Sequence, residues 1–205
     1  AGNDLNIDTV KVRNRSESRW GNRKKGGTSI TDTTTNIGSN IASGGNVTLN
    51  ANNNINITGS DVNSAGDATL TAGNEVNIAS AQDTYYNYEE SYKKGLTYAK
   101  SSVNINQRVT NQSSNILTDG NITITSGNDL NITASDLAGQ SGSLVAGIYL
   151  DNDPNSATFN QNIINNAANV NIINAKDSNY TFSENKKTHF SDNNLSYFSL
   201  SFFNN

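Results

Sequence analysis

The chain has 205 residues, of which 33% are hydrophobic and 16% are charged, and its formal net charge is −4. This length fits one domain or one repeat array, and the acidic balance argues against a general nucleic-acid-binding protein. Without cysteine and with a single histidine, the sequence has no disulfides and too few ligands for a histidine-based or cysteine-based zinc site.

Residues 1–7, AGNDLNI, are the first of four related copies of a short motif that ends in (L/V)NI. The other copies are residues 72–78, 126–132 and 166–172. Each copy joins a corner rich in Gly, Ala and Asn, which tolerates left-handed conformations, to an alternating strand. The chain starts in the middle of a repeat, so we expect it to be a piece of a longer protein whose targeting signals lie outside it.

Residues 44–82 carry the clearest periodicity, because the second half of this stretch repeats the first. The paired positions are Val47 and Ala68, Leu49 and Leu70, Ile55 and Val76, and Ile57 and Ile78. Thr or Asn alternates with these apolar residues, which sends the apolar side chains to one face of a strand. One unit cannot bury this face alone, whereas stacked units can. The sequence therefore predicts an all-β solenoid, a parallel β-helix with about 20–21 residues per coil. Stacked Asn residues are expected to form side-chain ladders along it.

Three polar segments interrupt this pattern. They follow Asp8, Asp83 and Asp177, and each reaches a pair of lysines at 24–25, 93–94 or 186–187. Strand-like residues come after the first two pairs, so we expect β-hairpin-like excursions from the coil. The excursions divide a single β-helix fragment, residues 1–205, into large repeats at about 8–82 and 83–176 and a truncated one at 177–205.

Residues 143–162 enlarge the second large repeat and are predicted to form a loop or hairpin. Within them the apolar run 144–150 is predicted to be a strand, and no run approaches the roughly 20 residues of a membrane-spanning helix. Asp151, Asn152 and Asp153 offer oxygen ligands suited to Ca²⁺, but an EF-hand loop also needs Gly at its sixth and Glu at its twelfth position. A plain turn before Pro154 is the better interpretation.

Together these motifs resemble the haemagglutinin repeats of filamentous haemagglutinin and of CdiA-type exoproteins, which are secreted by the two-partner route. The resemblance covers residues 1–189 and rests on the corner-and-strand motif, the Asp-to-Lys-pair excursions and the short coil repeat. It implies a right-handed parallel β-helix in a long filament that serves adhesion or contact-dependent growth inhibition. We expect eight to ten turns, a secreted protein on the bacterial cell surface, and export through an outer-membrane two-partner transporter.

The excursions hold the candidate partner-binding residues. These are Trp20, Lys24, Lys25, Tyr85, Tyr86, Tyr88, Tyr92, Lys93 and Lys94. Interleaved aromatic and cationic side chains can bind a target-cell glycan, lipopolysaccharide or an outer-membrane protein. The alternative is that they belong to solvated hairpins whose aromatic side chains cover the coil. Neighbouring repeats of the same polypeptide are the other expected partners, and nucleic acid is not one.

Parallel β-helices also occur in carbohydrate-active enzymes, whose sites need clustered carboxylates. Here the acidic residues fall mostly at corners, about one per turn: Asp61, Asp67, Glu75, Asp129 and Asp136. The only histidine, His189, has no nucleophile motif near it. We therefore expect no catalytic residue, no cofactor and no metal. A structural and binding segment is the predicted function, with a carbohydrate-active enzyme and a dedicated receptor-binding module as alternatives.

Overall fold

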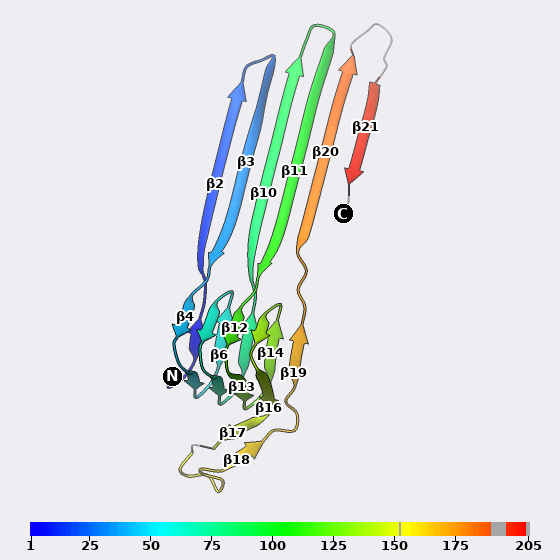
Figure 1. Cartoon of the computed structure of the whole chain (residues 1–205). Coiled ribbons are helices and arrows are strands. Elements are labelled where there is room, and N and C mark those ends of the chain that lie inside the picture. Colours follow the sequence, from blue (N-terminus) through cyan, green and yellow to red (C-terminus); the bar gives the residue numbers. More distant parts are fainter. Residues whose placement is uncertain (152, 190–195, 204–205) are drawn as a thin grey trace. The chain divides into compact units, whose positions relative to one another are not determined.

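The computed structural model describes residues 1–151, 153–189 and 196–203. The regular elements of these residues are all β-strands, and they fall into two units (Figure 1). The first unit comprises residues 1–10, 36–81 and 111–175, and the second comprises residues 11–35, 82–110 and 176–205. No helix of the described residues is long and apolar enough to cross a membrane.

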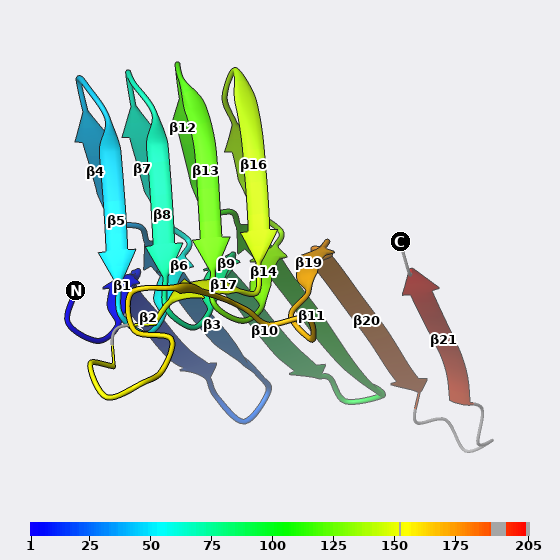
Figure 2. The same cartoon turned by 90° about the horizontal axis from the view of Figure 1, so that it is seen from below.

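Three parallel sheets make up most of the first unit, and their strands stack side by side in Figure 2. The first sheet contains β1 (Leu5–Ile7), β6 (Ile55–Thr58), β9 (Val76–Ala79), β14 (Leu130–Thr133) and β19 (Val170–Ile173). The second contains β4 (Asn40–Ser43), β7 (Asp61–Ser64), β12 (Asn115–Thr118) and β15 (Asp136–Ala138). The third contains β5 (Val47–Ala51), β8 (Ala68–Ala72), β13 (Asn121–Ser126) and β16 (Ser141–Ala146). The all-β prediction is confirmed, and the parallel sheets are consistent with a β-helix.

The register of these sheets confirms the repeat predicted within residues 44–82. Strands β5 and β8 pair Leu49 with Leu70, and β6 and β9 pair Ile57 with Ile78. The apolar side chains of each strand turn inward, whereas the Thr and Asn between them are exposed or half-buried. Leu70, Ile57 and Ile78 have no exposed surface at all. The core is thus built from apolar residues stacked on their own equivalents, and each such side chain contributes about 1.5–3 kcal/mol on burial.

An asparagine ladder runs along the outside of the first sheet, as predicted. In each step the Nδ2 of one Asn donates to the Oδ1 of its equivalent on the preceding strand. The steps are Asn56 to Asn6 (2.8 Å), Asn77 to Asn56 (3.0 Å), Asn131 to Asn77 (2.8 Å) and Asn171 to Asn131 (2.8 Å). Each amide uses its donor and its acceptor along the stack, so the ladder favours the in-register arrangement.

The sequence separation along this ladder shows where other segments are inserted. Asn56 and Asn77 are 21 residues apart, but Asn6 and Asn56 are 50 apart and Asn77 and Asn131 are 54 apart. Both longer separations contain a segment of the second unit. The predicted total of eight to ten turns is therefore too high. Within the described residues no parallel sheet has more than five strands, because the excursions pair elsewhere.

The enlarged loop is a hairpin of β17 (Ile148–Leu150) and β18 (Asn162–Ile164), which pair antiparallel, as predicted. The apolar run 144–150, however, is not one strand. Gly147 lies between β16 and β17 with a φ of 83°, a left-handed conformation that glycine adopts at little cost. The chain bends there and leaves the third parallel sheet.

The second unit is one six-stranded sheet in which the excursions lie side by side. Its order is β2 (Val10–Gly21), β3 (Lys25–Ile37), β10 (Ala81–Lys94), β11 (Tyr98–Gln112), β20 (Ser178–His189) and β21 (Ser196–Phe203). The pairs β3–β10, β11–β20 and β20–β21 are antiparallel. Within each excursion, consecutive strands are neighbours in the sheet (β2 and β3, β10 and β11, β20 and β21), so the excursions are hairpins, as predicted. That they join into a single sheet was not predicted.

An ion pair fastens β2 to β3. The guanidinium of Arg13 donates from Nε to Asp32 Oδ1 (2.9 Å) and from a terminal nitrogen to Asp32 Oδ2 (2.5 Å). The hydrogen bonds from Arg13 lower the pKa of the Asp32 carboxyl. The pair is solvent-exposed, so its contribution to stability is small. That contribution is present above the pKa of a free aspartate and is lost as the pH falls through the lowered value.

Replacing Leu70 with Ala should destabilise the first unit by about 2–5 kcal/mol, because a fully buried stacked residue leaves a cavity. Chemical denaturation followed by far-ultraviolet circular dichroism measures this change. Leu96→Ala is the matched control, since the Leu96 side chain is 99% exposed, and it should change stability by less than about 0.5 kcal/mol. Equal effects of the two substitutions would contradict the stacked core.

A pH titration of the Asp32 carboxyl by nuclear magnetic resonance should give a pKa below that of a free aspartate. Arg13→Gln should raise this pKa toward the ordinary value, because it removes the hydrogen bonds that hold the ionised form. Arg23→Gln, in the turn at the other end of the hairpin, serves as the control. An Asp32 pKa that is the same with and without Arg13 would show that the ion pair does not form in solution.

Candidate functional site

Four lysines form a row across one face of the six-stranded sheet. Residues directly opposite one another on antiparallel strands share a face. The register pairs Lys25 with Lys93 and Lys100 with Lys187. The turn between β10 and β11 is closed by Gly95 N donating to Tyr98 O (2.8 Å), which places Lys93 opposite Lys100. We call Lys25, Lys93, Lys100 and Lys187 the lysine row.

A groove of about 720 Å³ lies over the lysine row. The residues that line it are Trp20, Lys25, Ser91, Tyr92, Lys93, Lys100, Ser101, Ser102, Asn185, Lys186 and Lys187. Trp20 packs over Gly27, where an added Cβ would lie 3.1 Å from the indole ring. Glycine at this position therefore lets the ring approach the sheet. The Trp20 side chain is 55% exposed, so much of it is available to a ligand.

Within the part of the chain that the structure describes, no salt bridge involves the lysine row. The salt bridges there are made by Arg13, Arg15 and Arg19. Lys100 makes a cation–π contact instead, with its Nζ 5.8 Å from the centroid of the Tyr98 ring. Like charges placed directly opposite each other destabilise a sheet. An anion in the groove would relieve this repulsion, so the arrangement is suited to binding negatively charged groups.

Four of the nine predicted binding residues meet at this groove: Trp20, Lys25, Tyr92 and Lys93. The Tyr92 hydroxyl donates to Asn22 O (2.8 Å) and so ties the β2–β3 turn to β10. Lys24 and Lys94 lie next to the groove without lining it, and Lys94 N donates to Lys24 O (2.7 Å). The Nζ of Lys94 is 6.0 Å from the centroid of the Tyr92 ring.

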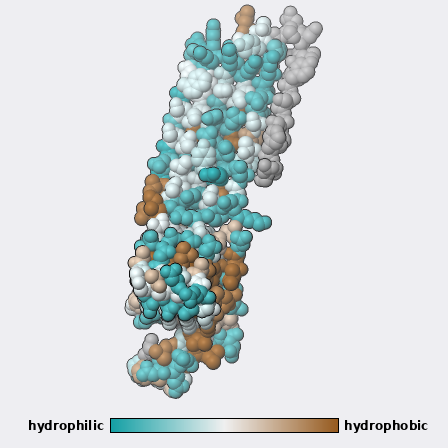
Figure 3. Space-filling view, viewed as in Figure 1, coloured by the Kyte–Doolittle hydropathy of each residue, from teal (hydrophilic) through white to brown (hydrophobic). Residues whose placement is uncertain are grey.

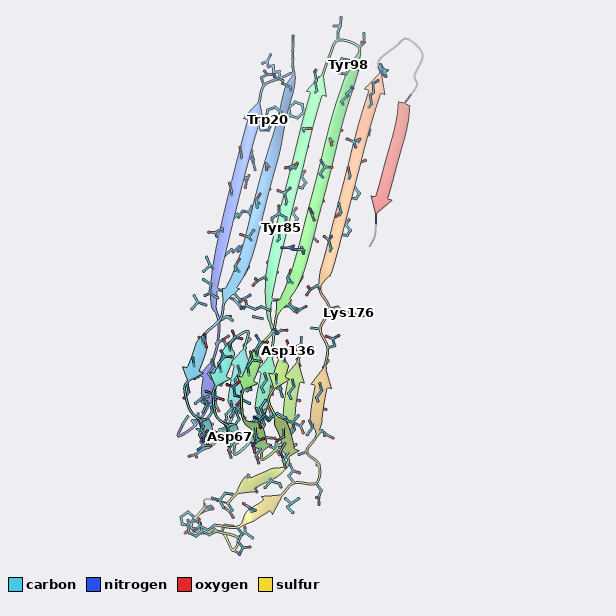
Figure 4. All side chains as sticks on the ribbon, in the orientation of Figure 1. Trp20, Asp67, Tyr85, Tyr98, Asp136 and Lys176 are labelled. Atoms are coloured by element: carbon cyan, nitrogen blue, oxygen red, sulfur yellow. The ribbon has the colours of Figure 1, made fainter. Side chains whose placement is uncertain are left out.

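The remaining tyrosines do not join this group. Figure 4 places Trp20 and Tyr98 near the turn end of the sheet and Tyr85 farther along β10. Tyr85 borders a separate hollow with Arg108. Because side chains alternate along β10, Tyr86 and Tyr88 point to the opposite face from Tyr85. Burial and a hydrogen bond to Glu90 (3.2 Å) raise the pKa of Tyr88.

Sequence reasoning missed Lys100, Lys186 and Lys187 as lining residues. A signal for two of them was present, because Lys186 and Lys187 are the lysine pair of the third excursion and correspond to Lys24–Lys25 and Lys93–Lys94. Lys100 carries no comparable signal, since it lies on a returning strand. The face of the hairpin sheet seen in Figure 3 is mostly hydrophilic.

Three acidic residues of the coil, Asp61, Asp67 and Asp129, link neighbouring layers. The Asp61 carboxylate accepts from Asn115 Nδ2 (2.7 Å), Asp67 from the backbone N of Asn121 (2.8 Å), and Asp129 from the backbone N of Asn169 (2.8 Å). Glu75 accepts from Asn77 Nδ2 (3.4 Å). Among the described residues no group of three or more His, Cys, Asp or Glu could hold a metal ion.

The possible calcium ligand Asp151 and the only histidine, His189, were also considered from the sequence. Asp151 accepts from Thr158 Oγ1 (2.6 Å) and from the backbone N of Asp153 (3.0 Å), and hydrogen bonds from Ser156 and Thr158 lower its pKa. Its carboxylate thus closes the loop between β17 and β18, and Asn152 lies outside the described residues. His189 is exposed and lies opposite Tyr98.

Comparison with known proteins gives one match. The profile of the hemagglutinin repeat family matches residues 20–104 and 95–197. Searches of curated proteins and of solved structures give no significant match. The two matched stretches overlap and cover most of the sequence, including the second excursion, parts of the first and third, and most of the stacked strands. This chain therefore belongs to the hemagglutinin repeat family.

Proposed function

We propose that this chain is a structural and binding segment of a large secreted bacterial surface exoprotein of the filamentous haemagglutinin type. Membership of the hemagglutinin repeat family carries the proposal. Exoproteins of this type serve adhesion or contact-dependent growth inhibition. They leave the cell through an outer-membrane two-partner transporter, which is therefore the expected export partner.

In this proposal the first unit is a right-handed parallel β-helix that acts as a length of shaft. Support comes from three parallel sheets whose strands follow one another in the same order through successive layers. Connections between parallel strands of one sheet are right-handed in about 98% of cases. Such a stack has open strands at both ends, so neighbouring repeats of the same polypeptide would pair with β1, β4 and β5 at one end and with β15, β16 and β19 at the other.

The second unit supplies the recognition surface. A shaft needs no row of lysines placed opposite one another, and the repulsion within such a row has a cost that an anionic ligand offsets. Trp20 adds a large, half-exposed aromatic surface beside the lysines, and residues of this type dominate binding energy at interfaces. The groove therefore favours a receptor-binding role alongside the structural one. Tyr85, Tyr86 and Tyr88 stay candidate contacts outside the groove.

The labelled chain should bind to whole bacterial or epithelial cells, and Trp20→Ala should weaken this binding by roughly tenfold, the loss expected for a contact worth about 1.4 kcal/mol. Flow cytometry over a concentration series gives the apparent Kd. The control is Tyr180→Ala, a 46% exposed aromatic residue on the opposite face of the same sheet. If neither cell type is bound, or if the two variants behave alike, the groove is not a recognition surface and the chain is a spacer.

A further inference from the structure

Positive charge is concentrated at the turn end of the six-stranded sheet. Eight of the 14 Lys and Arg residues lie there: Arg23, Lys24, Lys25, Lys93, Lys94, Lys100, Lys186 and Lys187. We call residues 20–27, 91–102 and 185–189 the basic tip. These ranges contain no Asp or Glu, so the other six basic residues share the rest of the chain with all 18 acidic ones. An acidic protein thus carries a strongly cationic region at the turn end of this sheet.

The register brings these three ranges together. Lys25 pairs with Lys93 and Lys100 pairs with Lys187. The first two turns and the C-terminal end of β20 therefore lie at the same end of the strands. The chain enters and leaves these strands at their other ends. Strands of 12 to 15 residues separate the two ends of the first two hairpins. At about 3.3 Å per residue this amounts to roughly 40–50 Å.

The apex of the β10–β11 turn carries an apolar side chain with no structural role in the sheet. Leu96 is 99% exposed, so its side chain contributes almost no burial to folding. Turn positions favour Gly, Asn, Asp or Pro, and nothing in the turn itself calls for leucine. Lys93, Lys94 and Lys100 flank it, and Trp20 presents its half-exposed indole on the same end of the sheet.

This combination of chemistry fits an interface between water and lipid. Apolar and amphipathic aromatic side chains enter the headgroup region, whereas lysine stems lie along it and place their ammonium groups at the phosphates. Clustered Lys and Arg are attracted to anionic lipid surfaces. A free polyanion would also be held by the lysine row, but it would gain nothing from an exposed leucine at the apex of the turn.

We propose that the basic tip docks on a lipid surface that carries phosphate groups. Leu96 and Trp20 enter the headgroup region, and the lysines on either side of them contact the phosphates. This inference rests on the recognition role proposed above and names the kind of surface that is recognised.

Co-sedimentation with vesicles tests it. The whole chain should bind vesicles of phosphatidylcholine mixed with phosphatidylglycerol much more strongly than vesicles of phosphatidylcholine alone. Binding should weaken as salt rises, because exposed charges are screened over about 8–10 Å at physiological ionic strength. Leu96→Ala should reduce binding to the anionic vesicles roughly threefold or more, and a Lys93→Gln, Lys100→Gln double variant roughly tenfold or more.

Two controls match these variants in residue type and lie outside the basic tip. Leu150→Ala removes a 49% exposed leucine from the β17–β18 hairpin, and a Lys11→Gln, Lys176→Gln double variant removes the same charge as the tip variant. Both should bind like the unmodified chain. Far-ultraviolet circular dichroism checks that every variant is folded.

Three outcomes would overturn the lipid inference. They are equal binding to both kinds of vesicle, equal losses from the tip and control lysine variants, and full binding by Leu96→Ala. Full binding by Leu96→Ala, together with tight binding of heparin, would show that the lysine row binds free polyanions. If cells are bound in a Trp20-dependent way while anionic vesicles are not, the recognition role stands and only the lipid inference fails. If vesicles are bound and cells are not, the proposed recognition role fails instead.

Discussion

The structure depends on one constraint, the in-register stacking of equivalent residues on parallel strands. The chain has too few apolar residues for a thick core, yet Leu70, Ile78 and Ile124 are fully buried, because each lies against its equivalents in adjacent layers. The backbone hydrogen bonds between layers and the asparagine ladder require the same register. A shift of one residue would turn the apolar side chains outward and break the ladder, so polar and apolar interactions select a single alignment.

The hairpins of the second unit are inserted in the chain between layers of the parallel stack. The first hairpin follows β1 in the chain and the second follows β9. In the first parallel sheet, β6 lies between β1 and β9. Two strands are therefore added to the antiparallel sheet for every two layers added to the parallel stack. Hairpins of successive large repeats pair with each other in the antiparallel sheet, as β3 does with β10.

The two units use their side chains differently. In the first unit the polar residues hold layers together, as the links from Asp61, Asp67 and Asp129 illustrate. In the second unit the sheet forms from long backbone pairings, and its side chains carry charge and aromatic surface. Strand pairing then gathers basic residues from three separate excursions into one row. The proposed binding surface therefore depends on strand pairing between segments that are distant in sequence.

The parallel stack could be predicted from the amino-acid sequence, because its short period repeats along the chain and can be read locally. The hairpins, the extra hairpin near Pro154 and the corner role of the acidic residues were indicated in the same way. The number of layers and the face of each tyrosine could not be predicted, since both depend on which segments pair. The groove exists only in the folded chain, where Lys100 and Lys187 join Lys25 and Lys93 through antiparallel register between separate excursions. Such pairing leaves no periodic signal in the chain, because it is fixed by backbone hydrogen bonds between strands distant in sequence.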